Sequence, residues 1–355
     1  MMNNQSGRRH RRRWLGLVCL SMLVLAVGGR AARALLIVPT YDSSITSNAN
    51  AAAIQAAIGT AINTVDGLYS DAGTVGIYFK FNASVLGSTS TVRYVTTTAD
   101  YVAALQADAT ANPNNTVLAT AVAHINSVPA SLVAGTSALF RVALGANSVT
   151  PCFSATGGFL PGCNGVNDAV ITIGTTDTGS PGAGLNSKAV AVIEHELNEV
   201  LGGGGPGTML TAATSLPASV LGSTAIGVTD FYRYLSATGN CAGITSTLST
   251  SNLANVVACY SIDGGVTALA QMNQNTNGSD YGDFAFTGTN NIQNANYSGA
   301  TPLYSTLSPE FTMLLSIGWD PIPEPAVLGL FLVGLAGLAG VRWHESRSQI
   351  KSARV

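Results

Sequence analysis

Apolar residues recur three and four positions apart between Asn48 and Tyr69, where Ile54, Ile58 and Ile62 share one face. This spacing matches the period of an amphipathic helix, so we expect a helix over residues 48–69. The same reading predicts strands over 74–81, 89–96, 138–144 and 168–173, and further helices over 100–109, 115–126 and 187–201.

The predicted helix over 187–201 ends at four consecutive glycines, Gly202–Gly205, the strongest stop signal in the chain. After residue 216 the pattern changes to short strands and turns. Ser308, Pro309 and Glu310 then open a last short helix, with a cap followed by proline at the first helical position. This mixture predicts the α+β class, with a mixed sheet and an irregular, β-rich C-terminal half.

The first 34 residues have the three-part pattern of a secretory signal peptide. Five arginines between Arg8 and Arg13 precede the apolar run Trp14–Val27, which is short for a permanent membrane span. Small residues follow, and Ala32-Arg33-Ala34 is the expected site for signal peptidase. The mature chain would then begin near Leu35; the alternative is an N-terminal membrane helix.

The C-terminal residues 321–355 form a second such segment. Pro323-Glu324-Pro325 precedes an apolar helix over 326–341 and a basic end, an order that would hold the chain temporarily in the inner membrane. This tail resembles the PEP-CTERM sorting signal of Gram-negative bacteria that make exopolysaccharide. The resemblance implies cleavage by an exosortase and a final place in the periplasm, on the outer surface or in the extracellular matrix. An ordinary single-pass anchor is the alternative.

Charge and cysteine content limit what the body between these segments can do. Residues 35–320 hold five basic and sixteen acidic side chains, a balance that disfavours nucleic-acid binding. Four cysteines in an exported body favour disulfides, and we expect Cys152 to pair with Cys163 and Cys241 with Cys259. A zinc site made of four thiolates is the competing interpretation, but no C-x-x-C spacing supports it.

The chemistry is concentrated in the helix before the glycines. His195 and Glu199 are four residues apart and so share one helical face, where both can ligate one Zn²⁺ ion. Glu196 would lie beside that ion as the general base, as in H-E-x-x-H metallopeptidases. Gly205 occupies the position where a third ligand would continue this motif, so the third ligand must come from elsewhere or be missing.

Several landmarks together resemble a family of PEP-CTERM-sorted, zincin-like metallopeptidases. They are the His195–Glu199 motif and the segments Leu36–Ile45, Asp230–Tyr234, Tyr260–Gly265 and Ile317–Trp319. The resemblance implies a zincin-like fold with an active-site helix, and glutamate as the family's second ligand. The chain departs from the family at Gly203, where the resemblance leads us to expect arginine. Within this fold we expect the strand 169–173 to be the sheet edge that lines the cleft.

The segment after the motif offers further candidates. Asp230 is the expected third metal ligand, with an ion pair to Arg233 as the alternative. Tyr232 and Tyr234 are candidates for oxyanion contacts, and Arg233 for a substrate contact, against the interpretation that the tyrosines are core aromatics.

Other polar residues have more ordinary interpretations beside a functional one. His124, the only other histidine of the body, is expected to be a satisfied helix residue. Asp263, Asp280 and Asp283 lie among Gly and Asn, where turn chemistry competes with a Ca²⁺ site.

The sequence therefore predicts a domain over 35–320 that hydrolyses peptide bonds of a protein substrate with the help of zinc. The alternative is a non-catalytic surface or biofilm-matrix protein on a zincin-like scaffold that has lost turnover. No G-x-S-x-G motif supports a serine hydrolase.

Overall fold

The computed structural model describes residues 35–125, 131–174, 187–208, 210, 225–251, 253, 255–274, 280–295 and 304–323. The predicted signal peptide and the predicted apolar tail helix lie outside these ranges. The chain divides into two units, Met1–Pro321 and Ile322–Val355. None of the helices in the described ranges is both long and apolar enough to cross a membrane. The class is α+β, as predicted, with mixed sheets and several helices.

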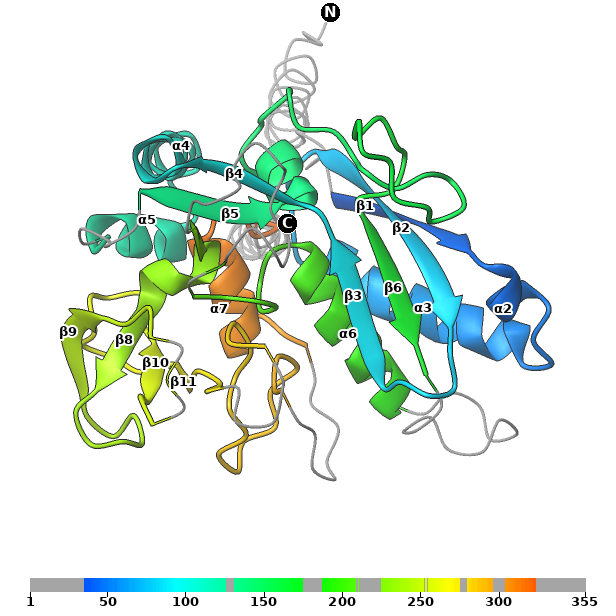
Figure 1. Cartoon of the computed structure of the whole chain (residues 1–355). Helices are drawn as coiled ribbons and strands as arrows, with labels where there is room; N and C mark the ends of the chain where they lie inside the picture. The colour runs from blue at the N-terminus through cyan, green and yellow to red at the C-terminus, as the bar shows by residue number, and fades with distance from the viewer. Residues whose placement is uncertain are drawn as a thin grey trace, which may run out of the picture. The chain divides into compact units, whose positions relative to one another are not determined.

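The first sheet has the strand order β1-β2-β6-β3 (Figure 1). Its strands are β1 (Leu35–Tyr41), β2 (Gly73–Phe81), β6 (Ala169–Ile173) and β3 (Gly87–Thr91). β1, β2 and β6 are parallel, whereas β3 runs antiparallel to β6. The prediction that 169–173 is the edge strand was therefore wrong. Its apolar residues are buried because β6 is flanked on both sides, and the short, polar β3 forms the edge.

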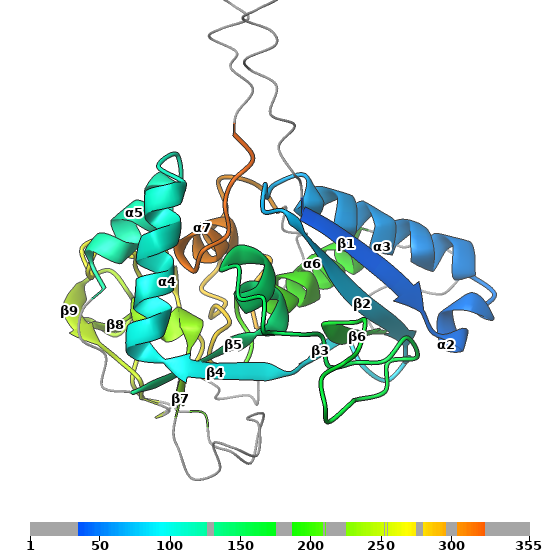
Figure 2. The same ribbon diagram turned by 90° about the horizontal axis from the view of Figure 1, so that it is seen from above.

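Two helices cover one face of this sheet, as Figures 1 and 2 show. α3 (Ala51–Asp66) places the predicted isoleucine stripe in the core and packs against α6 (Ser187–Val200). α6 in turn contacts β3 and β6. A short helix, α2 (Ser43–Thr46), follows β1 and is capped by Asp42, which accepts a hydrogen bond from the Ser44 amide. The candidate chemistry on α6 therefore lies directly under the edge strand.

The predicted strand over 89–96 is divided between two sheets. β3 ends at Thr91, and β4 (Arg93–Thr97) pairs with β5 (Leu132–Thr136), which pairs with β7 (Ala225–Gly227). The largely apolar run over 138–144 was predicted as a strand, but it forms a π-helical turn, η1 (Leu139–Ala143). Short apolar runs are compatible with either a strand or a helix. Here the strand β5 directly precedes the run, and the run itself is helical.

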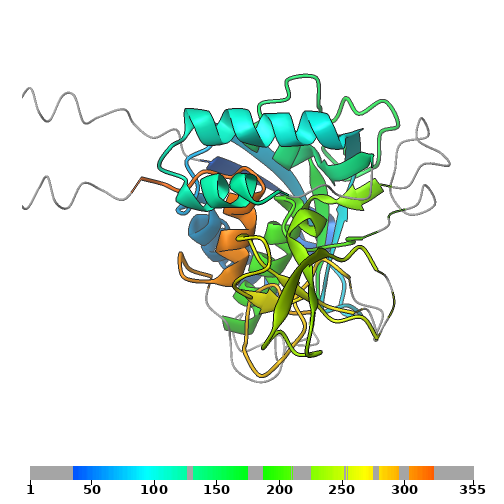
Figure 3. The same cartoon turned by 90° about the vertical axis from the view of Figure 1, so that its left-hand side faces the viewer.

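Helices α4 (Thr98–Ala111) and α5 (Thr116–Ala123) follow β4 and pack on each other. α5 also contacts the last helix, α7 (Pro309–Ser316), which begins at the predicted cap, Ser308. Figure 3 shows the cyan helix α4 on the opposite side of the body from the yellow-green segment around residues 225–250. The core ends at the fully buried Trp319, whose indole N–H donates to the Leu201 carbonyl at 2.8 Å.

The C-terminal half is built from short strands, as predicted. The turn η3 (Val228–Tyr232) leads into a sheet of order β11-β10-β8-β9. Its strands are β8 (Arg233–Ser236), β9 (Ile244–Leu248), β10 (Ala258–Tyr260) and β11 (Ala270–Gln271). Both predicted disulfides are confirmed: Cys152–Cys163 lies in the loop before β6, and Cys241–Cys259 joins the loop between β8 and β9 to β10 of this sheet.

Candidate functional site

Helix α6 carries the predicted site residues His195 and Glu199, whose side chains are slightly exposed. Its apolar residues, among them Ile193, Leu197 and Val200, are buried in the main core. The chain leaves the helix at Gly202, whose φ of 99° lies in the left-handed region that favours glycine. This turn at Gly202 keeps the following residues close to the last turn of the helix.

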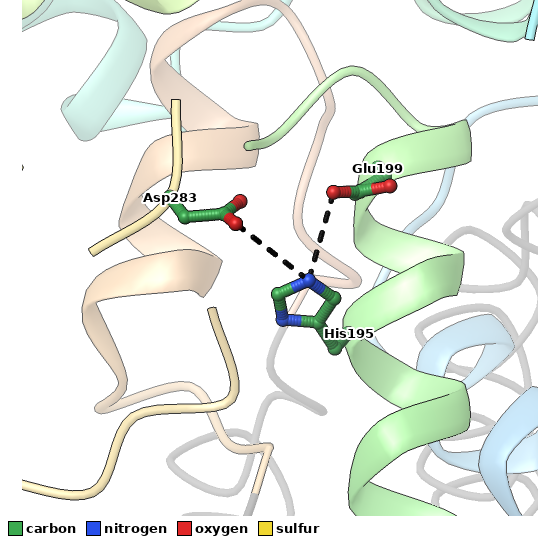
Figure 4. Close-up of side chains that lie close together, drawn as sticks. All are labelled: His195, Glu199 and Asp283. Atoms are coloured by element: carbon green, nitrogen blue, oxygen red, sulfur yellow. Dashed lines mark ion pairs between the residues drawn. The ribbon is translucent and has the colours of Figure 1, made fainter. Parts of the chain in front are cut away.

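His195 is held in one orientation by the backbone. Its Nδ1 donates to the Ile292 carbonyl at 2.9 Å, because a carbonyl can only accept. Its Nε2 lies 3.6 Å from Glu199 Oε1 and 4.0 Å from Asp283 Oδ2, and Figure 4 shows the imidazole between these two carboxylates. A neutral imidazole with this tautomer presents the lone pair of Nε2 to the carboxylate side.

His195, Glu199 and Asp283 each offer one ligand atom, and these atoms lie within 4.8 Å of one another. The side chains of His195 and Glu199 are 12% and 11% exposed, and that of Asp283 is 5% exposed, so only a small part of the group is accessible to solvent. The helix pair was predicted from sequence, whereas Asp283 joins it from a segment 84 residues after Glu199.

Asp283 is fixed by hydrogen bonds to its other oxygen. Oδ1 accepts from the Gln293 side-chain amide at 2.8 Å and from the Gly205 amide at 3.2 Å. Gln293 also accepts from the side-chain amide of Asn198 on α6. A Cβ on Gly204 would lie 2.1 Å from Gln293 Nε2, so this network requires glycine there. Oδ2 is thereby left facing His195.

Gly203 has a local reason for departing from the arginine expected there. A Cβ at this position would lie 2.6 Å from Asn198 Nδ2 and 2.9 Å from Leu314 Cδ2. Asn198 is fully buried and donates to the Gly203 carbonyl at 3.2 Å. Asn198 of α6 and Leu314 of α7 therefore leave no room for a side chain at residue 203.

Glu196 lies beside the cluster and contacts the edge strand. It is 5% exposed, and its Oε2 accepts from the Thr89 hydroxyl at 2.6 Å. A Cβ on Gly87 would lie 2.3 Å from Glu196 Oε1, which real Cβ atoms do not tolerate. The absence of a side chain at Gly87 thus makes room for the carboxyl group, and Thr89 orients it.

Burial and neighbouring charges shift the pKa values of the ionisable side chains around His195. Burial acts to lower the pKa of His195, but the carboxylates of Asp283, Glu199 and Glu196 hold it well above its ordinary value. Burial, with the Glu199 charge, raises the pKa of Glu196 to about 8. Burial raises the pKa of Asp283 to about 7 and that of Asp280 to about 6, with Glu199 contributing to both. Perturbed pKa values of this kind are typical of functional sites.

Arg93 places a buried positive charge near the same carboxylates. It is 6% exposed, and burial lowers its pKa while Glu199, Asp280 and Asp230 act in the opposite direction. A Cβ on Gly205 would lie 3.0 Å from Arg93 Nη2 and 3.8 Å from the Glu199 carboxylate. The guanidinium therefore offsets part of the negative charge of the cluster.

His195, Glu196, Glu199 and Asp283 line a cleft of about 250 Å³. The edge strand and the residue before it form one wall, with Leu86, Gly87 and Thr89. The rest of the lining comes from α6 and from the irregular segments around Asp283 and Asn294. The cleft thus joins the candidate metal ligands, Glu196 and the edge strand in one solvent-accessible space.

The structure does not bring Asp230, the predicted third ligand, to this cluster; the third side chain beside His195 and Glu199 is Asp283. Asp230 is fully buried, and its Oδ2 accepts from the amides of Gly227 at 2.8 Å and Thr208. Burial raises its pKa to about 6, against the effect of Arg233. Within the described residues it forms no ion pair with Arg233 either, so Asp230 organises the turn η3.

The other predicted contacts from this segment are also internal. Tyr232 and Tyr234 are buried core aromatics, which was the alternative interpretation, and they donate to the carbonyls of Ser316 and His124 at 2.6 and 3.4 Å. Arg233 is fully buried and donates to the carbonyl of Tyr281 at 3.0 Å. None of the three lines the cleft.

The remaining sequence candidates have the ordinary roles. His124 ends α5, and its Nδ1 bonds to the Thr120 carbonyl at 2.8 Å. Asp263 accepts from the amides of Val266 and Thr267 at 3.1 and 2.8 Å, which is turn chemistry. Comparison with known proteins adds no constraint, because the chain matches no protein-family model, no curated protein and no solved structure.

Proposed function

We propose that the protein is an exported, zinc-dependent metallopeptidase with a zincin-like fold, in which His195, Glu199 and Asp283 hold the metal. The observation that carries this proposal is the convergence of one imidazole and two carboxylates within 4.8 Å, beside a buried Glu196 in an open cleft. A mixed sheet whose antiparallel edge strand contacts the motif helix supports the zincin-like fold.

The three side chains suit a divalent ion in chemistry as well as in distance. Imidazole nitrogen and carboxylate oxygen are both zinc ligands. The hydrogen bond from His195 Nδ1 to the Ile292 carbonyl is the outer contact that ligating histidines usually have. Neighbouring carboxyl groups with raised pKa values also show that negative charge is costly here, and a dication would relieve that cost.

The residues of the cleft can perform the proton transfers of peptide hydrolysis. A zinc ion held here would supply Lewis-acid chemistry, which makes water more acidic and a carbonyl more electrophilic. Glu196 accepts the proton of the attacking water as the water oxygen bonds to the peptide carbon, and it returns the proton to the amine nitrogen as the C–N bond breaks. Thr89 holds Glu196 in place through the 2.6 Å hydrogen bond.

The edge strand suggests how a protein substrate would bind. No other strand among the described residues pairs with the outer side of β3. An extended peptide can add to such an edge through main-chain hydrogen bonds. A peptide on β3 would pass along Gly87, which leaves room for the Glu196 carboxyl group, and Thr89, which donates to it.

Export is part of the proposal because the two disulfides favour an oxidising compartment outside the cytosol. Two disulfides are stable in an oxidising compartment and rare in the cytosol. The proposed signal peptide over 1–34 and the proposed sorting tail over 321–355 would take the chain through signal peptidase and an exosortase to the cell surface or matrix.

Metal removal tests the proposal. We expect the purified protein to cleave an unstructured substrate such as casein, to lose this activity on chelation, and to regain it with one equivalent of Zn²⁺. Two carboxylates make a harder site than two histidines do, so Mn²⁺ belongs in the same series. If the protein binds zinc but cleaves neither casein nor its own chain, the alternative of a non-catalytic surface protein holds.

A further inference from the structure

The backbone carbonyl that orients His195 belongs to a segment that is itself anchored. Ile292 accepts from His195 Nδ1 through its carbonyl, while its amide donates to Glu310 Oε1 at 2.6 Å. Glu310 lies in the first turn of α7, whose cap at Ser308 fixes where that turn begins. The described structure thus links α7 to the imidazole through a single residue.

The same segment also holds another candidate ligand, Asp283. Gln293, next to Ile292, donates to Asp283 Oδ1 at 2.8 Å. Its backbone carbonyl accepts from the Phe284 amide at 2.8 Å, which ties the segment to the residue after Asp283. A displacement of Ile292 would therefore move the supports of both His195 and Asp283.

Burying the Glu310 carboxyl group costs free energy, and packing alone does not explain why a carboxyl group lies at this position. Its side chain is fully buried, and its Oε2 has no hydrogen-bond partner in the part of the chain that is described. Burial raises its pKa to about 7, while hydrogen bonds from its own backbone amide and from the Ile292 amide, together with the charge of His195, act to lower it. A leucine of similar size would avoid this cost, so the carboxyl group needs another reason to be there.

We propose that Glu310 is a positioning residue for the metal site: its hydrogen bond to the Ile292 amide fixes the segment that orients His195 and Asp283. This inference rests on the proposed function, because it takes those two residues as metal ligands. Outer contacts of this kind change metal affinity by roughly 10–100-fold when they are removed.

The test measures zinc affinity by competition with a chromogenic chelator, in wild type and in three variants of the full-length protein. Glu310→Leu removes the acceptor, and we expect zinc to bind roughly 10–100-fold more weakly. Glu310→Gln keeps an acceptor oxygen for Ile292 and is expected to bind zinc within about threefold of wild type. Ser308→Ala is the matched control, because it weakens the same helix without touching Ile292.

Imidazole NMR supplies a second readout. The Nδ1 proton of His195 should be protected from exchange in wild type and in Glu310→Gln, and should exchange rapidly in Glu310→Leu. Should Glu310→Leu fail to fold, Glu310→Asp withdraws the carboxylate from the Ile292 amide more mildly and is measured in the same way.

Three results separate the possibilities. No zinc binding by wild type would overturn the proposed metal site itself. Wild-type affinity and proton protection in the folded Glu310→Leu or Glu310→Asp variant would overturn the positioning role. An equal loss of affinity in Ser308→Ala would also overturn it, since the effect would then come from the general stability of α7.

Discussion

Glu196→Gln is expected to abolish peptide hydrolysis while leaving zinc binding intact. Glutamine has nearly the same shape and can still accept the hydrogen bond of the Thr89 hydroxyl. It cannot accept and return a proton, and the loss of a general base typically costs roughly 10²–10⁴-fold in rate. We therefore expect kcat to fall by that factor, measured on a fluorogenic peptide, with zinc stoichiometry as in wild type.

A control substitution on the same helix distinguishes the loss of the base from a general disturbance of α6. Glu194→Gln alters a buried carboxyl two residues earlier, one whose pKa burial raises to about 7 and which does not line the cleft. It should leave kcat within a few-fold of wild type. Activity of Glu196→Gln at the wild-type rate would contradict the role of Glu196 as the base.

Asp283→Asn and Asp230→Asn form the second test, and they are expected to differ strongly. Asp283→Asn removes a charged oxygen that faces His195 Nε2 at 4.0 Å. Its zinc affinity should fall by more than the roughly 10–100-fold that is typical of changes outside the ligand set. Asp230→Asn keeps an acceptor for the Gly227 and Thr208 amides, so its zinc affinity should stay within a few-fold of wild type.

Isothermal titration of both proteins with Zn²⁺ measures this difference directly, with thermal unfolding as the check on folding. The opposite outcome, lost zinc binding in Asp230→Asn and wild-type affinity in Asp283→Asn, would return the third-ligand role to the residue that the sequence favoured.

Local patterns predicted the part of the site that lies on one helix. His195 and Glu199 converge because residues four apart share a helical face, and the glycines after Leu201 end that helix as expected. Asp283 could not be assigned in this way, because it lies on an irregular segment far along the chain. Its only signal was an acidic residue among glycines and asparagines, which equally describes Asp263, a plain turn residue.

The errors in the fold have similar causes. The run over 89–96 is continuous in β propensity, so the sequence gives no sign that the chain passes from one sheet to another near Val92. The η1 segment is short and apolar apart from Arg141, and periodicity does not separate a strand from a helix in such a run. Pairing partners far apart in sequence decide both cases.

The central claim is that His195, Glu199 and Asp283 bind one metal ion. Zinc K-edge X-ray absorption of the purified, zinc-loaded protein tests it most directly. The account predicts one zinc per chain in a shell of one imidazole nitrogen and carboxylate or water oxygens at about 2.0–2.2 Å. Absence of stoichiometric zinc, or a shell that contains no imidazole, would contradict it.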